Sequence, residues 1–454
     1  MNRHFLAGRY GLNDKAALES EEGEVLTEMQ LVSSNKGLDH GLGRALRDLT
    51  RLGIYPSEIG LDLLVLAAHV HAADTRVSRA TESQDTWTRE IRLLVPVSDV
   101  ALWMTAVGTL ERMLNFLTGD RWKIGFRGRP KGFSNLVPKR HASVKAPPFN
   151  ALSLFSGGMD SLIGAIDLLE SGSTPLLVSH AGEGATSDAQ TTLFEALRRA
   201  YSQTPLNRFR LWMNFPKNFI RGVAGEDTTR GRSFLFFAAG VAAGTGLSGS
   251  FSLLVPENGL IALNVPLDPL RLGSLSTRTT HPFYMARWNE LIQRLGITGG
   301  VRNPFWDKTK GEMTKGCSNQ ALLGKLLPQS LSCSSPTKGR WKGRGVEHCG
   351  YCLPCLIRRA AVKAALAKDE TLYTLEDLRA APLDTRKAEG QQVRSFQYAV
   401  ERLARRPGLA SVLIHKAGPL TDPSAAELLA LSHVYGRGMD EVGALLSKVR
   451  TSAL

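Results

Sequence analysis

Short apolar runs alternate with stretches of helical period through the first two thirds of the chain. Residues 151–155 form one such run, and residues 162–169 then repeat apolar side chains at helical spacing. Residues 90–97 and 122–126 read as further strands, whereas residues 61–70, which are rich in alanine, read as a helix. Strands that alternate with helices are typical of α/β folds with parallel sheets. We therefore expect an α/β protein.

Helical spacing dominates near the end of the chain. Apolar side chains recur at helical intervals from Val393 to Leu403, and the pattern stops before Pro407. A second helix is expected at residues 424–434, with Asp422 as its cap. The C-terminal tail is therefore predicted to be helical.

Shifts in composition divide the 454 residues into five predicted parts. A basic stretch punctuated by prolines, which includes Arg127 and Arg129, is expected on the surface, as a solvated connector or a nucleic-acid contact. The parts are an N-terminal α/β domain of unknown role (1–126), this basic linker (127–149), a parallel-sheet domain (150–325), a cysteine-containing segment (326–360) and a helical C-terminal region (361–454).

A glycine turn stands at the start of the third part. Residues 153–161 read Ser-Leu-Phe-Ser-Gly-Gly-Met-Asp-Ser, so a predicted strand runs into Ser156, Gly157 and Gly158 and then into a helix. Glycines let a ligand approach the backbone, and the free amides of a first helical turn favour an anion. No Gly-Lys-Ser/Thr run follows, and the third glycine of the dinucleotide fingerprint is missing. A plain strand-to-helix turn is the alternative.

The composition is that of a basic, soluble globular protein. Hydrophobic residues make up 43% of the chain and charged residues 22%. No apolar run reaches the roughly 18 residues of a membrane span, and the first residues lack a signal-peptide core, so we expect a cytoplasmic protein. The net charge is +14, and residues 302–359 hold eleven Lys or Arg against three Asp or Glu. Such a stretch suits polyphosphate, nucleic acid or an acidic partner, or serves solubility alone.

Four of the five cysteines cluster, at Cys333, Cys349, Cys352 and Cys355. Overlapping Cys-x2-Cys turns put three thiolates within reach of one tetrahedral ion, and Cys333 can complete the set. Structural zinc is the expected cofactor, because four thiolates leave no position open for water; an iron–sulfur cluster is the main rival. A disulfide framework is not expected in a reducing cytosol. Cys317 stands apart and reads as a small buried hydrophobe.

A smaller polar group occurs in the predicted N-terminal helix. His69, His71 and Asp74 have the residue types of a catalytic or metal site. Nothing nearby in the sequence completes such a site. We therefore expect these side chains to be polar residues of the core or the helix surface.

Together, the glycine turn and the cysteines resemble the 7-cyano-7-deazaguanine synthase (QueC) family of PP-loop ATP pyrophosphatases over residues 150–360. Residues 231–234, Gly-Arg-Ser-Phe, and residues 309–312, Thr-Lys-Gly-Glu, are similar to two further family motifs. The resemblance implies a Rossmann-type, adenine nucleotide α-hydrolase-like parallel sheet. It also implies an enzyme that adenylates 7-carboxy-7-deazaguanine with release of pyrophosphate. Ammonia then displaces AMP to give the amide, and a second ATP-driven step gives the nitrile.

Carried over by position, the resemblance implies an ATP site. Asp160, Ser161 and Lys310 would be catalytic, with Lys310 neutralising phosphate charge, and Mg²⁺ would bridge the phosphates. The residues implied to hold the nucleotide are Ser156, Gly157, Gly158, Met159, Asp160, Ser161, Ser179, His180, Arg232 and Lys310. The implied zinc ligands are Cys333, Cys349, Cys352 and Cys355.

Two segments depart from the family pattern. Residues 178–184 read Val-Ser-His-Ala-Gly-Glu-Gly where the family carries an aspartate-tyrosine-glycine-glutamine run. Residues 276–283 stand in place of the family's Y-P-D-C-R segment, which reads the deazapurine. We therefore expect the ATP chemistry to be retained and the acceptor pocket to be altered.

Long flanks are a third departure, since the synthase is about half this length. A QueC-like core with such flanks resembles QatC, the QueC-like component of the Qat anti-phage defence systems. That resemblance implies companion proteins: an ATPase, a small acceptor protein and a TatD-like nuclease. It also implies that the deazaguanine acid is joined to a protein amine instead of ammonia.

Three other functions stay open. The first is the ordinary synthase reaction with ammonia. The second belongs to a different class, a nucleic-acid-binding module with an inactive PP-loop whose basic zinc segment contacts DNA or RNA. The third is a PP-loop tRNA thiolase, which the cysteine spacing disfavours because a closed zinc site leaves only Cys317 to donate sulfur.

Overall fold

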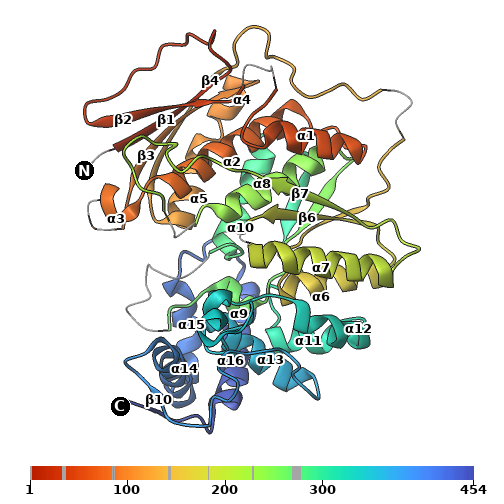
Figure 1. The fold of residues 1–454 in the computed structure, drawn as a ribbon, viewed down its shortest axis with the longest axis vertical. Coiled ribbons are helices and arrows are strands. Elements are labelled where there is room, and N and C mark those ends of the chain that lie inside the picture. Colours follow the sequence, from red (N-terminus) through yellow and green to blue (C-terminus); the bar gives the residue numbers. More distant parts are fainter. Residues whose placement is uncertain are drawn as a thin grey trace.

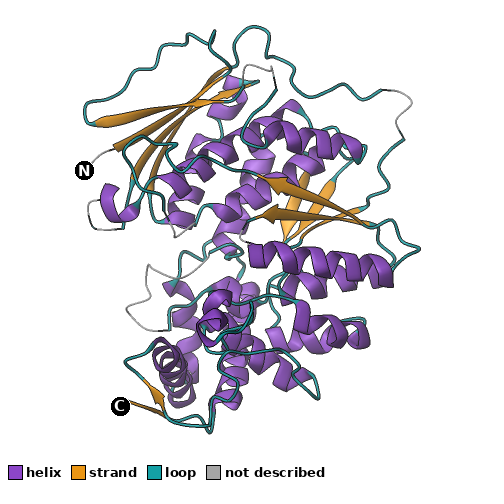
Figure 2. Ribbon diagram, viewed as in Figure 1, coloured by secondary structure: helices purple, strands orange, loops and turns teal. Residues whose placement is uncertain are grey.

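The computed structural model describes residues 3–32, 37–83, 85, 87–141, 145–182, 184–226, 230–267 and 278–453. Within these ranges the chain forms two larger parallel sheets, each flanked by helices, and a helical C-terminal part (Figures 1 and 2). The expected α/β class is confirmed. No helix in the described ranges is both long and apolar enough to cross a membrane.

The N-terminal unit is built on a four-stranded parallel sheet in the order β2-β1-β3-β4. The strands and the helix predicted at 90–97, 122–126 and 61–70 are confirmed as β3, β4 and α2. The elements are β1 (Arg3–Arg9), β2 (Glu24–Gln30), α1 (Leu42–Arg51), α2 (Glu58–Arg76), α3 (Arg79–Glu82), β3 (Glu90–Val97), α4 (Val100–Met104), α5 (Val107–Thr118) and β4 (Arg121–Gly128).

Helix α2 joins the N-terminal unit to the rest of the molecule. Every residue from Gly60 to Thr75 is buried, because the helix lies between the N-terminal sheet and α8 (Arg232–Thr245) (Figure 1). A Cβ at Gly60 would stand 2.4 Å from the Thr245 hydroxyl, so glycine permits the close approach of the two helices. A helix that is apolar on all sides is typical of such a central position.

The second sheet has five parallel strands in the order β7-β6-β5-β8-β9. Helices α6 and α7 pack on one face and α8 on the other (Figure 1). The chain leaves β5 and β8 in opposite directions, which makes the gap between their carboxyl ends a topological switch point. The elements are β5 (Ala151–Leu154), α6 (Met159–Glu170), β6 (Pro175–Ala181), α7 (Gly184–Ala200), β7 (Asn207–Trp212), α8, β8 (Phe251–Leu254), α9 (Gly259–Leu263), α10 (Pro282–Arg294) and β9 (Gly299–Arg302).

The C-terminal part is helical, as predicted, apart from one pair of two-residue parallel strands. Its core packs α14 and α16 against α13 and α9. The elements are α11 (Lys310–Gly316), α12 (Gln320–Leu326), α13 (Leu353–Ala365), β10 (Leu383–Asp384), α14 (Ala388–Arg405), α15 (Ala410–Leu413), α16 (Ala425–Leu446) and β11 (Thr451–Ser452).

The predicted cap of α16 is wrong. Ser424, not Asp422, is the N-cap, because its hydroxyl accepts the Glu427 N–H at 3.3 Å while the Glu427 carboxylate accepts the Ser424 N–H at 2.7 Å. This reciprocal capping box satisfies two backbone donors. Asp422 instead forms an ion pair with Arg287.

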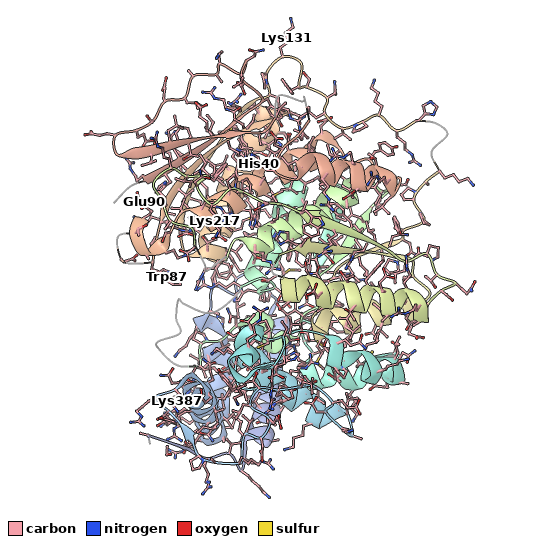
Figure 3. The ribbon with its side chains drawn as sticks, viewed as in Figure 1. His40, Trp87, Glu90, Lys131, Lys217 and Lys387 are labelled. Carbon is pink, nitrogen blue, oxygen red and sulfur yellow. The ribbon has the colours of Figure 1, made fainter. Side chains whose placement is uncertain are left out.

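The prediction that the whole basic linker lies on the surface is also wrong, because its first residues are partly buried. Strand β4 includes Arg127, and Arg129 has a side chain only 1% exposed. Arg127 pairs with Asp14, and Arg129 pairs with the fully buried Asp62 of α2. Further along, the linker does reach the outer edge of the molecule, where Lys131 is exposed (Figure 3).

Candidate functional site

A cavity of about 380 Å³ opens at the carboxyl ends of β5, β6 and β8. This is the switch point of the five-stranded sheet, where open α/β sheets bind their ligands. Predicted nucleotide residues from three separate segments meet there. The lining includes Ser156, Ser161, His180, Arg230, Arg232 and Glu257.

The glycine turn has the geometry of an anion cradle. Gly157 has a φ of 81°, and a Cβ there would lie 3.0 Å from the backbone nitrogen of Gln190, so glycine is needed on both counts. Gly158 is the N-cap residue of α6, and its carbonyl accepts the Leu162 N–H at 3.0 Å. The amides just before Leu162 have no acceptor within the helix, as at any helix start. The Met159 N–H donates to the Ser332 hydroxyl at 3.2 Å, which leaves the N–H groups of Asp160 and Ser161 for an anion.

Two hydroxyls stand at the mouth of this turn. The Oγ atoms of Ser156 and Ser161 are 3.2 Å apart, and both residues line the cavity. Ser161 also donates to the Gly158 carbonyl at 3.0 Å. The turn therefore offers hydroxyl groups as well as backbone amides to a bound anion.

Asp160 and Lys310 form a buried ion pair behind the turn. The Lys310 Nζ lies 2.9 Å from Asp160 Oδ1, and Asn258 donates its side-chain amide to Asp160 Oδ2 at 2.7 Å. Lys310 is the first residue of α11, whose start is fixed by a capping box between Thr309 and Glu312. Neither Asp160 nor Lys310 is among the residues that line the cavity. The positive charge of Lys310 is thus shared with Asp160 instead of being open to a ligand.

The structure adds Glu257, which the sequence analysis missed. Its carboxylate accepts a hydrogen bond from Thr280, and its backbone carbonyl accepts one from Asn303 Nδ2 at 2.7 Å. Burial raises the pKa of Glu257 to about 7, and the nearby Asp160 carboxylate adds to this effect. A polar Glu-Asn pair directly after an apolar strand was the signal in the sequence, because β8 ends at the switch point.

His180 and Arg232 line the cavity, and a third residue lies behind His180. The ring of His71, on α2, lies edge-on to that of His180, with 5.5 Å between centroids. Burial lowers the pKa of His180 to about 3 and that of His71 to about 4, and the Arg232 charge acts in the same direction. Both rings are therefore neutral at pH 7. His71 is a core residue, as predicted, but one that touches the site.

Four of the ten residues implied to hold the nucleotide line the cavity, and the other six do not: Gly157, Gly158, Met159, Asp160, Ser179 and Lys310. Ser179 is fully buried and donates its hydroxyl to the Phe155 carbonyl at 2.7 Å. Met159 places its side chain in the core between α6 and α11. These residues hold the turn in place and do not line the cavity.

The segments that depart from the family pattern also border the cavity. His180, Thr279 and Thr280 line it. Glu183, Ser276 and Thr277 belong to the same two segments and lie outside the described residues. Described residues of both segments therefore lie at the same cavity as Ser156 and Ser161.

The four clustered cysteines converge as predicted. Their sulfur atoms all lie within 4.8 Å of one another, and the pairs Cys333–Cys352 and Cys349–Cys355 are each 3.9 Å apart. A tetrahedral site with zinc–sulfur distances of about 2.3 Å has sulfurs about 3.8 Å apart. The backbone N–H groups of Ser335 and Cys349 donate to the Cys333 sulfur at 3.3 and 3.2 Å. This cluster can hold a metal ion such as zinc.

The basic stretch around the cysteines is partly internal. Arg358 is fully buried and donates to the Ser330 hydroxyl at 2.8 Å. Arg359 stacks on Tyr373, with its guanidinium carbon 3.8 Å from the ring centroid. His348 accepts the Ser332 N–H at 3.2 Å and is not one of the clustered ligands. Part of the local positive charge therefore stabilises the fold instead of facing a partner.

The cysteine segment closes over the glycine turn. The Leu331 N–H donates to the Gly157 carbonyl at 2.8 Å, and the Ser332 hydroxyl accepts the Met159 N–H at 3.2 Å. Cys333 itself lines the cavity. A metal bound by the cysteines would hence fix the wall of the cavity as well as the local fold.

Comparisons with known proteins return no relative. No protein-family model matches the chain, and neither the curated proteins nor the solved structures searched include a match.

Proposed function

We propose that residues 150–325 form a PP-loop nucleotide domain and that the chain uses ATP to adenylate a carboxylate. The observation that carries this proposal is that Ser156 and Ser161, on either side of the two glycines, meet Arg232 and Glu257 in one cavity at the switch point of the sheet. Backbone amides, two hydroxyls and two arginines offer donors and positive charge to a polyphosphate. Thr279 and Thr280 also line this cavity, and we propose that the carboxylic acid substrate binds beside them.

The first step forms an acyl adenylate. A carboxylate oxygen of the substrate attacks the α-phosphorus of ATP, and the bond from that phosphorus to the bridging oxygen breaks. Pyrophosphate leaves with the bonding electron pair. Donors held in place by the fold stabilise charge on the leaving group, a role for the turn amides, Ser156, Ser161 and Arg232. When Mg²⁺ is bound it supplies further neutralisation of the phosphates.

The second step transfers the acyl group to an amine. The amine nitrogen attacks the acyl carbon, the bond from that carbon to the AMP oxygen breaks, and the nitrogen loses a proton. Glu257 is suited to accept that proton, because a carboxylate with a pKa of about 7 is a general base matched to neutral pH. The products are an amide and AMP.

The substrate and partners are proposed from the resemblance to QueC-like proteins. The acid is a 7-deazaguanine carboxylate, and the acceptor is an amine on a companion protein of an anti-phage defence system. The altered residues at 178–184 and 276–283 support a changed acceptor, since members of both segments line the cavity. The companion ATPase, small acceptor protein and TatD-like nuclease belong to the same proposal.

The cysteine cluster is proposed as a structural zinc site. Cys333, Cys349, Cys352 and Cys355 supply four thiolates, which leave no open position for catalysis. Elemental analysis after aerobic purification separates zinc from an iron–sulfur cluster.

The test supplies the protein with ATP, Mg²⁺ and 7-carboxy-7-deazaguanine, with and without each companion protein, and measures pyrophosphate, AMP and intact masses. Pyrophosphate and AMP together with a mass gain on one companion are expected. Ser161→Ala should lower pyrophosphate release by about a hundredfold, as loss of a single transition-state donor does elsewhere. Ser171→Ala, at the exposed far end of α6, is the matched control.

Other products would point to other functions. Free nitrile with ammonia, and no mass gain on any companion, would identify the ordinary synthase reaction. Nucleic-acid binding with a steep salt dependence, and no pyrophosphate with any acid, would identify a binding module. ADP and orthophosphate as the only products would contradict the proposal.

A further inference from the structure

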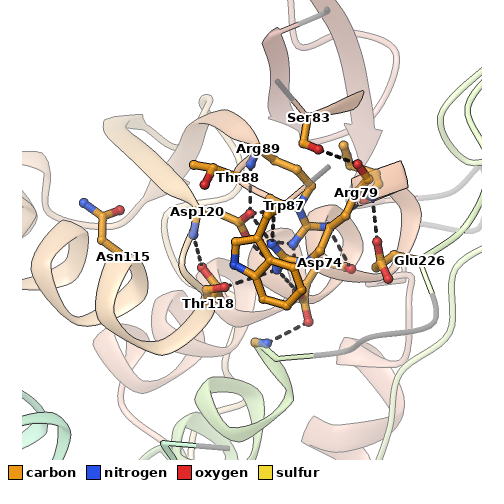
Figure 4. Close-up of polar contacts among 12 residues, drawn as sticks. Asp74, Arg79, Ser83, Trp87, Thr88, Arg89, Asn115, Thr118, Asp120 and Glu226 are labelled. Carbon is orange, nitrogen blue, oxygen red and sulfur yellow. Dashed lines mark hydrogen bonds and ion pairs between the residues drawn. The ribbon is translucent and has the colours of Figure 1, made fainter. Parts of the chain in front are cut away.

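The N-terminal unit contacts residues 230–232, which place Arg230 and Arg232 at the cavity. The Gly231 N–H donates to Asp74 Oδ2 at 2.7 Å, and the guanidinium of Arg230 lies over the Trp87 ring, 4.2 Å from its centroid. Asp74 is on α2 and Trp87 precedes β3, so both partners belong to the N-terminal unit (Figure 4). Arg230 and Arg232 both line the cavity.

Asp74 is held rigidly by a buried charge cluster. Arg89 donates to Asp74 Oδ1 at 3.0 Å and to Asp120 Oδ2 at 2.7 Å, and Arg79 donates to both Asp120 oxygens at 2.6 and 2.8 Å (Figure 4). These four side chains are 0–4% exposed. Two carboxylates and two guanidiniums balance one another, and the fork of each arginine fixes the geometry. The acceptor for Gly231 is thus set by the N-terminal core.

Residues that precede Arg230 in the chain also form hydrogen bonds to the end of α2 and the start of α3. The Glu226 carboxylate accepts the Arg79 N–H at 2.6 Å, and the Glu226 N–H donates to the Thr75 carbonyl at 3.1 Å. Arg76, the last residue of α2, donates to the Phe215 carbonyl at 2.6 Å. The end of α2 therefore holds the connection between β7 and α8 at several points.

Arg230 is a surplus positive charge beside this balanced cluster. Burial lowers its pKa to about 10, with Arg79 acting in the same direction, so it remains charged at pH 7. The guanidinium carbons of Arg79 and Arg230 lie 5.2 and 4.2 Å from the centroid of the Trp87 ring. A cation held over an aromatic face and open to a cavity is a preorganised partner for a polyanion.

We propose that the N-terminal unit is a positioning module for the phosphate-binding arginines, and that Trp87 and Asp74 are its positioning residues. The ligand they serve is the pyrophosphate portion of a nucleotide, so the proposal rests on the proposed function for the identity of the ligand. It gives residues 3–128 a role in binding that their own sequence does not indicate.

A double-mutant cycle tests the role of Trp87. Trp87→Ala, Arg230→Ala and the double variant are compared with wild type for binding of inorganic pyrophosphate and of Mg²⁺-ATP by titration calorimetry. Each single change should weaken pyrophosphate binding by about tenfold. The double variant should be no weaker than Arg230→Ala alone, because Trp87 acts through that arginine. Trp87→Phe, which keeps a ring face, should recover most of the affinity.

Trp212→Ala is the matched control. Its ring also carries two guanidiniums, of Arg44 at 4.9 Å and Arg210 at 4.4 Å, but it does not line the cavity. It should leave pyrophosphate affinity within about twofold of wild type. Asp74→Asn removes a buried charge and can destabilise the fold, so its binding data need thermal melting as a control. The Trp87 variants therefore decide whether the proposal holds.

Three results would overturn the proposal: unchanged affinity in Trp87→Ala, a loss equal to that of Trp212→Ala, or additive losses in the double variant. These are separable from failure of the proposed function. A wild-type protein that binds pyrophosphate and ATP but adenylates no acid would end the proposed function and leave the positioning role intact. A wild-type protein that binds neither would end both.

Discussion

The ammonium of Lys310 lies 2.9 Å from the carboxylate of Asp160, and both side chains are buried. Asp160 is in the first turn of α6, and Lys310 is the first residue of α11. The pair therefore joins the helix that begins at the glycine turn to the part of the chain that leads to the cysteines. Breaking a buried pair costs more than making it gains, because the remaining charge is left without a partner.

Lys310→Ala should destabilise the fold by about 3–5 kcal/mol, as expected for removal of one member of a buried ion pair. The Asp160 carboxylate would keep only its hydrogen bonds from Asn258. Urea denaturation followed by circular dichroism measures the loss. Lys315→Ala, on the exposed face of the same helix, is the control and should change stability by less than about 0.5 kcal/mol. Equal midpoints for the two variants would refute a buried pair.

Cys352→Ser should remove the metal and unfold the segment around it. Zinc bound by four thiolates contributes folding free energy directly, and a serine hydroxyl is a poor substitute for a thiolate. Metal content by elemental analysis and the midpoint of thermal unfolding should fall together. Because Leu331 and Ser332 bond to the glycine turn, nucleotide binding should weaken as well.

The control for that experiment is Cys317→Ala. Cys317 is buried but lies outside the cysteine cluster, so this variant should keep its full metal content. A Cys352→Ser protein that stayed folded with its metal bound would show that Cys352 is not a ligand.

Glu257 should make the fold less stable as the pH rises from about 4.5 to about 7. Its pKa is about 7 in the folded chain and about 4.5 in the unfolded chain, so between these values the folded state binds more protons. Stability falls with rising pH wherever the folded state binds more protons. The full effect is roughly 3.5 kcal/mol, from about 1.4 kcal/mol for each pKa unit. Below about pH 4.5 the stabilisation is complete, and above about pH 7 no further loss occurs.

The measurement is the difference between wild type and Glu257→Gln in urea stability from pH 4 to 8. Glutamine keeps an acceptor for Thr280 but cannot ionise. The free energy of unfolding of Glu257→Gln should increase relative to that of wild type as the pH rises through this range. Subtraction removes the opposite trend from the buried, neutral histidines, which the two proteins share. A flat difference would show that the pKa of Glu257 is the same in the folded and the unfolded chain.

The features that could be predicted from the sequence are local. The strand, glycine and helix around Gly157 follow from residues adjacent in the chain, and the convergence of four cysteines follows from their spacing. The capping box of α16 was equally local, since serine and glutamate stand three residues apart at Ser424 and Glu427. Asp422 stands directly before Pro423, which also suits a helix start, but its carboxylate pairs with Arg287.

The features that could not be predicted depend on packing between distant segments. Asp74 and Gly231 are 157 residues apart, and nothing in either segment names the other. Glu257 and Thr280 likewise meet only because β8 and the start of α10 lie at one end of the sheet. Arg129 was expected on the surface because of its charge. Asp62, within the largely apolar helix α2, was the sign that a cation must be buried beside it.

That ion pair gives the last prediction. Arg129 donates to Asp62 and has a side chain 1% exposed, while Asp62 also accepts the N–H and hydroxyl of Ser98 at 2.7 and 2.6 Å. Arg129→Ala should destabilise the chain by about 3–5 kcal/mol, because it leaves the Asp62 carboxylate buried without its cation. Lys131→Ala, two residues along the linker and exposed, should be close to neutral.

The pH dependence of this loss separates an unpaired carboxylate from a simple packing defect. Burial already raises the pKa of Asp62, and Arg129 opposes that rise. Without Arg129 the pKa of Asp62 climbs further above its unfolded value, so the folded variant takes up a proton on acidification. The loss of stability in Arg129→Ala should then be largest at neutral pH and shrink as the pH falls toward 4. A loss of the same size at every pH would assign the effect to lost packing of the arginine side chain.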